Sequence, residues 1–393
     1  MDFQKSVEHQ LFAIPFTVLT LCGAWCPENW SHENKRIYSV YTCFIMILGI
    51  IFFTEMMINI VLTFNSDNFN MENIFTAIVV GVGIYKKINV LLYRANIMNF
   101  INEYATNQWY KPRNIEETAI YSANLSERRR VTIVYAGLIL AAVLLRSILP
   151  ILEAGTFLIL PLEAWYPYNV DNVVSFLLTY LHQMISGVTL SCMHLSTDTL
   201  FVSLLMQMCC QINILKHRLP KVDESGTDND RMNEQMSNAR FLIEQRVREH
   251  ESIYRFGCDL QDTFRPLLAG QMVIFVPNLI INIYFLSTNS NRQNLKYFTT
   301  LFYASVSLMQ IYMFCWYGNE VTLGSIDLGN ALYESNWINL NHRTKKLLLT
   351  IITRTSKSIL ISAAVIVPLN IDSFIKIMKT SYSAFNFLQH VST

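Results

Sequence analysis

Long apolar stretches separated by short polar segments dominate the pattern along this chain. A membrane-spanning helix needs about 20 mostly apolar residues. Seven stretches meet or approach that length, and they predict transmembrane helices at residues 37–64, 74–93, 131–152, 173–205, 267–285, 298–315 and 358–377. The fourth stretch is longer than a bilayer requires, so its far end is expected to project into water. The pattern therefore predicts an all-α membrane protein with seven transmembrane helices.

Two segments depart from a simple spanning pattern. The second stretch contains Lys86 and Lys87 in the sequence YKKIN, and we expect both ammonium groups to reach the lipid headgroups at one end of that helix. Before the first span, residues 11–27 are apolar but too short to cross a bilayer. A signal peptide would have a basic start and a small-residue cleavage site. Because the first residues mix acids with bases and bulky residues surround CGAWCP, a membrane-associated helix is favoured instead.

Lysine and arginine residues concentrate in alternate loops. One set of loops carries most of them, whereas the opposite set holds only Arg292 and Lys296, with Lys376 and Lys379 near the chain end. Basic loops remain on the cytoplasmic side of a membrane. This asymmetry predicts a cytoplasmic N-terminus and an extracellular C-terminus, the reverse of a G-protein-coupled receptor.

A polar segment with spaced apolar residues lies between the last two predicted spans. After Gly318 these residues recur at roughly helical spacing: Val321, Ile326, Leu328, Leu332, Tyr333 and Trp337. A helix lying on the lipid surface would carry a strongly basic polar face, whereas Glu320, Asp327 and Glu334 make this face acidic. The pattern favours an amphipathic helix below the membrane that packs against neighbouring cytoplasmic helices or another subunit.

Composition supports the membrane assignment and excludes several functions. The hydrophobic share is 52%, and the formal net charge of +1 provides no basic field for a nucleic acid. The eight cysteines include no C-x-x-C pair, so neither a metal site nor a disulfide framework is predicted. The chain has no Gly-rich phosphate loop, G-x-S-x-G or H-E-x-x-H motif, so no enzyme activity and no cofactor are expected.

The C-terminal third resembles the insect odorant receptors, and the resemblance extends over essentially the whole chain. Its most specific parts are CWYGNEVTLGSIDLGNALYESNW and RTSKSILISAAVIVPLNIDSFIKIMKTSYSAFNFL. The positions that match the family pattern are Cys315, Gly318, Asn319, Ser325, Tyr333, Trp337, Lys357, Phe374, Ser381, Tyr382 and Ser383. Two positions depart from it: Ile338 replaces a common aromatic residue, and Ser358 replaces a common proline.

The resemblance implies a ligand-gated, non-selective cation channel subunit in the plasma membrane of olfactory sensory neurons. It implies a small volatile ligand, surrounding lipid, and assembly as a heterotetramer with a shared odorant co-receptor or as a homotetramer. The seventh helix of each subunit would line one pore, and cytoplasmic helical extensions would form a tetrameric anchor. The alternative is a metabotropic seven-span chemoreceptor that couples to a G protein. A transporter is less favoured because no internal repeats with broken helices are seen.

Four regions follow from this resemblance. Residues 1–36 would form the cytoplasmic N-terminus with its short membrane-associated segment, and residues 37–315 the first six transmembrane helices with the ligand pocket in their outer half. Residues 316–357 would form the cytoplasmic anchor half of a split helix 7. Residues 358–393 would form its pore-lining half and a short extracellular tail.

Within these regions the resemblance points to individual side chains. The expected ligand-binding residues are Phe75, Val79, Val82, Leu145, Leu149, Thr179, Tyr180, Met184, Gly187, Ile280, Phe302, Tyr303 and Val306. The expected pore and gate residues are Phe374, Ile377, Met378 and Ser381, although Ile377 could instead pack against the sixth span. The expected anchor residues are Tyr317, Tyr333 and Trp337.

Ionisable residues within spans are functional candidates because burial in lipid disfavours charge. They are Glu55, Arg146, His182, His194, Asp198 and Arg265. Arg146 could pair with Glu153 or Glu163, or could face an acidic ligand. No metal site is expected, because His182 and His194 are too far apart on one helix to bind the same ion.

Overall fold

The computed structural model describes residues 2–27, 29–64, 71–106, 110–154, 160–219, 232–288, 295–334, 337, 342–363 and 367–392. Ten helices and one small hairpin occur in this part of the chain. The helices are α1 (Asp2–Leu21), α2 (His32–Thr63), α3 (Met71–Leu92), α4 (Arg94–Thr106), α5 (Ile115–Ala154), α6 (Val173–Arg218), α7 (Met232–Thr288), α8 (Leu295–Tyr333), α9 (His342–Thr355) and α10 (Ile371–Ser392). The hairpin pairs β1 (Ser362–Ala363) with β2 (Val367–Pro368) in antiparallel fashion.

The first six predicted spans are confirmed as helices that are long and apolar enough to cross a membrane. Among the described residues, six helices meet that criterion: α2, α3, α5, α6, α7 and α8. The 46 residues of α6 and the 57 of α7 correspond to about 69 and 86 Å at 1.5 Å per residue, far more than a bilayer needs. Both helices therefore extend beyond the apolar layer, which the sequence predicted for the fourth span.

The last predicted span is wrong in its position. None of the described residues in 358–363 and 367–370 is helical; this part of the chain is extended and includes the hairpin. The final helix, α10, begins only at Ile371. The apolar run before it reads as helical by hydropathy alone, but it docks on α8, where Ser325 Oγ accepts a hydrogen bond of 3.0 Å from the Ile359 amide.

The predicted boundary after residue 315, between the sixth span and half of a split helix 7, is also wrong. Helix α8 continues through Gly318 to Tyr333, so this segment extends the sixth span and is not the first half of a seventh helix. A Cβ atom on Gly318 would lie 2.3 Å from the Leu369 carbonyl oxygen. Glycine is thus required by the close approach of the chain before α10, rather than by a turn. Helix α9 is a separate amphipathic helix after it.

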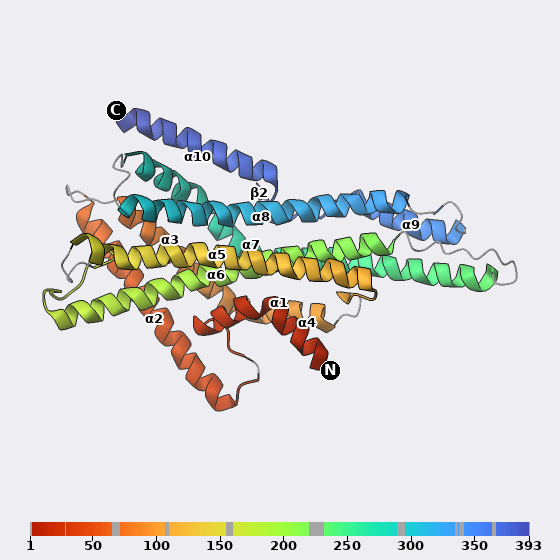
Figure 1. The fold of residues 1–393 in the computed structure, drawn as a ribbon, viewed down its shortest axis with the longest axis horizontal. Coiled ribbons are helices and arrows are strands. Elements are labelled where there is room, and N and C mark those ends of the chain that lie inside the picture. Colours follow the sequence, from red (N-terminus) through yellow and green to blue (C-terminus); the bar gives the residue numbers. More distant parts are fainter. Residues whose placement is uncertain are drawn as a thin grey trace.

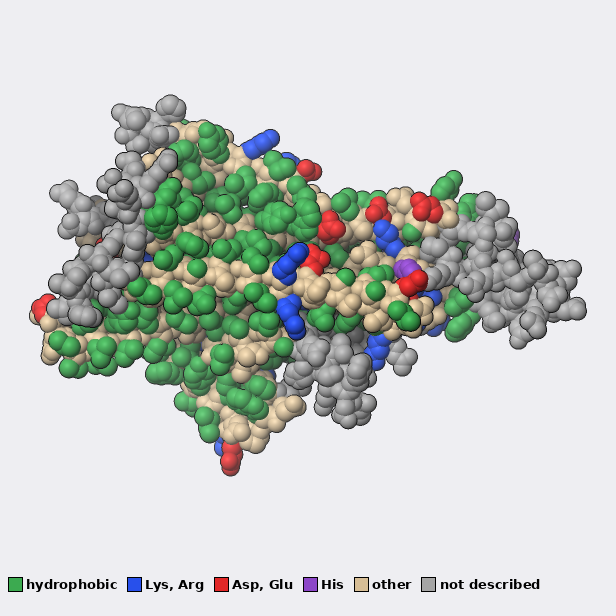
Figure 2. Space-filling view, viewed as in Figure 1, with side chains coloured by type: hydrophobic (Ala, Val, Ile, Leu, Met, Phe, Trp, Pro, Cys, Tyr) green, Lys and Arg blue, Asp and Glu red, His purple; other side chains and the backbone are tan. Residues whose placement is uncertain are grey.

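The long helices run side by side along the molecule, with α10 on one side and α1 and α4 on the other (Figure 1). Helix α6 lies at the centre and contacts α1, α2, α3, α5, α7 and α8. Hydrophobic side chains cover the face over the spanning helices, and charged side chains gather towards the end that carries α9 (Figure 2). At that end Arg218 pairs with Glu117 at 2.7 Å and Glu249 at 3.3 Å, joining α5, α6 and α7.

The two lysines of α3 do not reach lipid headgroups, contrary to prediction. Lys86 is fully buried and its ammonium group lies 2.5 Å from the Asp198 carboxylate on α6. Tyr135 of α5 donates a hydrogen bond of 3.0 Å to the same carboxylate, and the Gln310 amide of α8 donates another. Lys87 is also buried, but its ammonium group has no hydrogen-bond partner among the described residues. One carboxylate therefore joins four helices in the middle of the bundle.

Candidate ligand-binding cavity

A mostly apolar cavity of about 70 Å³ lies between α3, α5 and α6. We call it the main cavity. Its lining residues are Phe52, Phe75, Thr76, Val79, Val80, Val143, Arg146, Ser147, Leu162, Gln183, Met184, Gly187, Val188, Leu190, Ser191, His194 and Tyr303. A Cβ atom on Gly187 would meet nothing within 4 Å, so the missing side chain leaves part of this space open.

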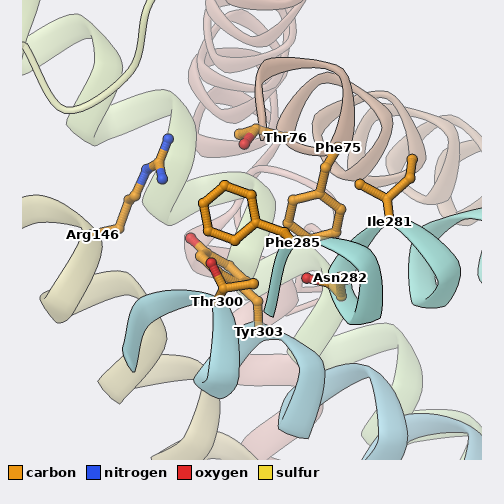
Figure 3. A pocket seen from close by; sticks show the side chains of 8 residues that line it. All are labelled: Phe75, Thr76, Arg146, Ile281, Asn282, Phe285, Thr300 and Tyr303. Carbon is orange, nitrogen blue, oxygen red and sulfur yellow. The ribbon is translucent and has the colours of Figure 1, made fainter. Parts of the chain in front are cut away.

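A second, smaller cavity of about 10 Å³ adjoins the first, and we call it the side cavity. Its lining residues are Phe75, Thr76, Arg146, Ile281, Asn282, Phe285, Thr300 and Tyr303, which come from α3, α5, α7 and α8 (Figure 3). Four of these residues also line the main cavity. Among them, Phe75 and Tyr303 form an edge-to-face pair with ring centroids 5.8 Å apart, so this pair stands between the two spaces.

The segment between α5 and α6 closes one end of the main cavity. Gln183 receives a hydrogen bond of 3.1 Å from the Leu162 amide and donates one of 2.8 Å to the Leu162 carbonyl. The same side-chain amide donates to the Tyr166 hydroxyl at 2.7 Å. Burial raises the pKa of the Tyr166 phenol, so this group is a neutral hydrogen-bond partner at physiological pH. Gln183, fully buried, thereby fixes the loop over the cavity.

The charged residue at the cavity is Arg146. Its guanidinium borders both spaces, and it interacts electrostatically with Glu163 and with the Tyr303 phenol. Glu163 also accepts a hydrogen bond of 2.7 Å from Asn73. The predicted partner Glu153 has a side chain outside the described residues. Glu163 is thus an opposite charge in the neighbourhood of Arg146.

The structure brings five of the thirteen predicted ligand residues to these cavities: Phe75, Val79, Met184, Gly187 and Tyr303. Seven others line neither space, namely Val82, Leu145, Thr179, Tyr180, Ile280, Phe302 and Val306. Some of these have other contacts: the Thr179 hydroxyl bonds the Tyr168 hydroxyl at 2.8 Å, and Tyr180 donates to the Ser147 carbonyl at 3.4 Å. Leu149 lies on α5, but its side chain is outside the described residues.

Several residues that line the cavities were not among those predicted from the sequence. Thr76, Asn282 and Thr300 are examples, all of them polar and within apolar stretches. A polar side chain in a spanning helix is a usable signal, since it needs a partner away from water. Among the described residues, no group of three His, Cys, Asp or Glu side chains is placed to hold a metal ion.

The predicted gate residues pack within this chain. Phe374, Ile377 and Met378 lie against an apolar cluster of α7 and α8 that includes Phe275 and Ile311. These three side chains are partly buried, whereas Ser381 is fully buried. The exposed face of α10 carries Ile375, Lys379 and Tyr382 instead.

The predicted anchor residues differ in their surroundings. Tyr317 is buried and donates a hydrogen bond of 2.9 Å to Glu127. Tyr333 is 73% exposed, and the Trp337 indole donates to its carbonyl at 3.2 Å. Of the three, Tyr333 therefore offers the largest surface for contact with another subunit.

Comparison with known proteins decides the family of this chain. The profile of the 7tm odorant receptor family matches residues 66–382, which is most of the sequence. The chain belongs to the odorant receptor family. It is thus a multi-pass membrane protein of a receptor family, and the sequence-based resemblance to insect odorant receptors is confirmed.

Relatives and solved structures agree with this assignment. The receptor is 27% identical over 291 residues to odorant receptor 46a, isoform A, of Drosophila melanogaster, covering 73% of this chain and 74% of that one. It is 26% identical to odorant receptor Or1 of Anopheles gambiae, over 60% and 61% of the two chains. Its fold matches olfactory receptor OR5 of Machilis hrabei with a TM-score of 0.85 over 99% of both chains, at 17% identity.

Proposed function

We propose that this odorant receptor is the odorant-tuned subunit of a ligand-gated, non-selective cation channel. The observation that carries the proposal is the mostly apolar cavity between α3, α5 and α6, in a chain of this family. Small-molecule sites are typically apolar spaces with a few placed polar groups. A structure of OR5 from Machilis hrabei in complex with eugenol has the same fold, with a TM-score of 0.84. A small volatile molecule is the corresponding ligand here.

The proposed topology has seven spans, with the N-terminus in the cytoplasm and the C-terminus outside. Helix α10 is the seventh span, because its 22 residues extend about 33 Å and match the hydrocarbon thickness of a bilayer. The charged end of the bundle in Figure 2 lies in the cytoplasm, as expected where basic residues concentrate. The receptor acts in the plasma membrane of olfactory sensory neurons.

Assembly completes the channel in this proposal. Four subunits, either with a co-receptor or as a homotetramer, meet through the projecting ends of α6 to α9, where Tyr333 is exposed. One α10 helix from each subunit surrounds the ion path. Because Phe374, Ile377 and Met378 contact α7 and α8, the face of α10 left for ions carries Ile375, Lys379 and Tyr382.

Electrical recording tests the proposal. The full chain is expressed with and without the co-receptor in cells that lack other odorant receptors, and currents are recorded while an odorant panel is applied. We expect a cation current within the time of ligand application, unaffected by G-protein inhibitors. A response that those inhibitors abolish would instead support the metabotropic alternative. The absence of current for every odorant, with the complex detected at the surface, would contradict the channel.

A further inference from the structure

We propose that the side cavity recognises the hydroxyl group of an alcohol or a phenol, with the Asn282 side-chain oxygen as the acceptor of the hydroxyl proton. The inference rests on the proposed odorant-binding function and names the ligand class. The main cavity would hold the apolar part of the ligand. At about 10 Å³ the side cavity has room for a single small polar group, not for a whole odorant.

The first observation is an unused acceptor on a buried side chain. Asn282 is 1% exposed, and its side-chain oxygen has no hydrogen-bond partner among the described residues. The orientation of the amide is fixed, since its nitrogen donates to the Asn278 carbonyl at 2.8 Å and to Asn278 Oδ1 at 3.2 Å. In Figure 3 the oxygen points into the space between Phe75 and Tyr303. A buried acceptor without a partner is destabilising, and a ligand donor would remove that cost.

The second observation concerns the donors around the same space. Tyr303 borders both cavities, and its hydroxyl has no hydrogen bond within the described part of the chain. Arg146 carries only donors, and it approaches the same space from α5 (Figure 3). A ligand oxygen that accepts a hydrogen bond therefore has donors on one side, while the acceptor of Asn282 lies on the other.

These groups discriminate among polar head groups. A carboxylate would bring accepting oxygens against the Asn282 oxygen and add a second negative charge near Glu163. An ammonium group would bring positive charge to the side of Arg146. An ether, ester or ketone can accept from Tyr303 or Arg146 but leaves Asn282 without a donor. A hydroxyl group both donates and accepts, so it alone satisfies both sides without a net charge.

Matched ligand pairs test the inference. The probes are hexanol, benzyl alcohol and phenol, each compared with its own methyl ether, applied to the full receptor with its co-receptor. We expect at least one alcohol to act at a concentration about tenfold lower than its ether, because sites built for a hydroxyl discriminate strongly against analogues that lack it. The Asn282→Leu variant should lose that preference by weakening the alcohol response and leaving the ether response. Equal potency within all three pairs in the wild type would overturn the inference.

A second variant and a control distinguish loss of the hydroxyl site from misfolding of the receptor. Tyr303→Phe removes only the hydroxyl and should reduce the preference for alcohols over their ethers. This variant therefore tests the inference if Asn282→Leu does not reach the cell surface. Ser305→Ala on α8 is the control, because Ser305 lines neither cavity and its hydroxyl donates to the Leu301 carbonyl of the same helix at 2.8 Å. An alcohol preference unchanged in both Asn282→Leu and Tyr303→Phe would contradict the inference, as expected if a bound water satisfies Asn282.

Thermal unfolding of the purified receptor separates this inference from the channel proposal. Ligands that bind the folded state raise its stability. If alcohols stabilise the receptor more than their ethers while no odorant evokes current, the side cavity has the proposed role and the channel proposal fails. If odorants open the channel but the ethers stabilise the receptor as well as the alcohols do, the channel stands and the hydroxyl site is wrong.

Discussion

The two halves of helix α6 are packed in different ways, although they belong to one continuous helix. Between residues 173 and 195 the buried positions are Thr179, Gln183, Ser186, Leu190 and Met193, a spacing of three or four that marks a single face. The opposite face exposes large apolar side chains, as suits a helix in contact with lipid. From Ser196 to Met208, by contrast, all thirteen residues are buried. All the α6 residues that line the main cavity lie in the first half.

The same contrast extends to the helices around α6. Helices α3, α5 and α8 each supply residues to the cavities, and each also supplies one polar group to the Asp198 cluster: Lys86, Tyr135 and Gln310. On α6 the cavity residue His194 lies one turn before Asp198. A level that contains the two cavities therefore adjoins a level at which the same four helices are joined by one buried carboxylate. Any movement of the helices on ligand binding would then either stay at the level of the cavities or be transmitted to the rest of the bundle through Asp198.

Removing Asp198 should have the largest effect. Asp198→Leu leaves the Lys86 ammonium buried without its partner, and loss of one member of a buried ion pair typically costs about 3–5 kcal/mol. We expect this variant to be retained inside the cell, which surface labelling would measure. The double variant Lys86→Met with Asp198→Leu should recover much of the surface expression, because apolar replacement of both partners can be nearly neutral.

The neighbouring lysine provides a matched control. Lys87 is equally buried, but its ammonium group has no hydrogen-bond partner among the described residues. Lys87→Met should therefore preserve or increase surface expression, whereas Lys86→Met should reduce it. Equal losses for the two adjacent lysines would show that the Asp198 cluster is not what ties the helices together.

Sequence alone predicted the spanning helices well, because apolar length is a direct requirement of the bilayer. It failed at the region after α8, since hydropathy cannot distinguish an apolar helix from an apolar strand segment that docks on a neighbour. The described residues of 358–363 and 367–370 form such a segment. Similarly, the sequence shows that a polar segment follows Gly318, but the role of this glycine depends on Leu369, which is distant in sequence and close in space.

The cavity was predicted less completely than the fold. Hydrophobic pattern indicates which face of a helix is buried, but a cavity forms where facing side chains fail to fill the space between helices. Tyr180 and Met184 differ by one helical turn, yet only Met184 lines the cavity. That outcome depends on side-chain packing across several helices at once. The charge pair of Lys86 and Asp198 was missed for a related reason, because each residue was considered within its own helix.

The second prediction concerns the contact between α8 and the chain before α10. Gly318→Val would place a side chain against the Leu369 carbonyl, where even a Cβ atom would be 2.3 Å away. Overpacking of this kind costs about 1–3 kcal/mol. We expect lower surface expression than for the wild type but higher than for Asp198→Leu, and a changed odorant-evoked current in the receptors that reach the surface. Expression and current equal to the wild type would mean that the two segments separate readily.

The smallest effect on stability, but a specific one on ligand response, is expected at Gly187. A side chain there would extend into the main cavity without meeting any atom within 4 Å of its Cβ. Gly187→Val should leave surface expression unchanged or raise it, since glycine within a helix is less favourable than most residues. It should weaken the response to the larger odorants of a homologous series by about tenfold, given that a methylene group of pocket space is worth about 1–3 kcal/mol.

Gly137→Val is the matched control for this change. Gly137 lies in the middle of α5, and a Cβ atom there would also meet nothing within 4 Å, but Gly137 lines neither cavity. Both variants make the same change in backbone freedom and side-chain volume within a helix. A selective loss of response to larger odorants in Gly187→Val, with Gly137→Val equal to the wild type, would assign the effect to filled cavity space. If both variants lost response equally, helix flexibility would explain the result and the main cavity would not be the odorant site.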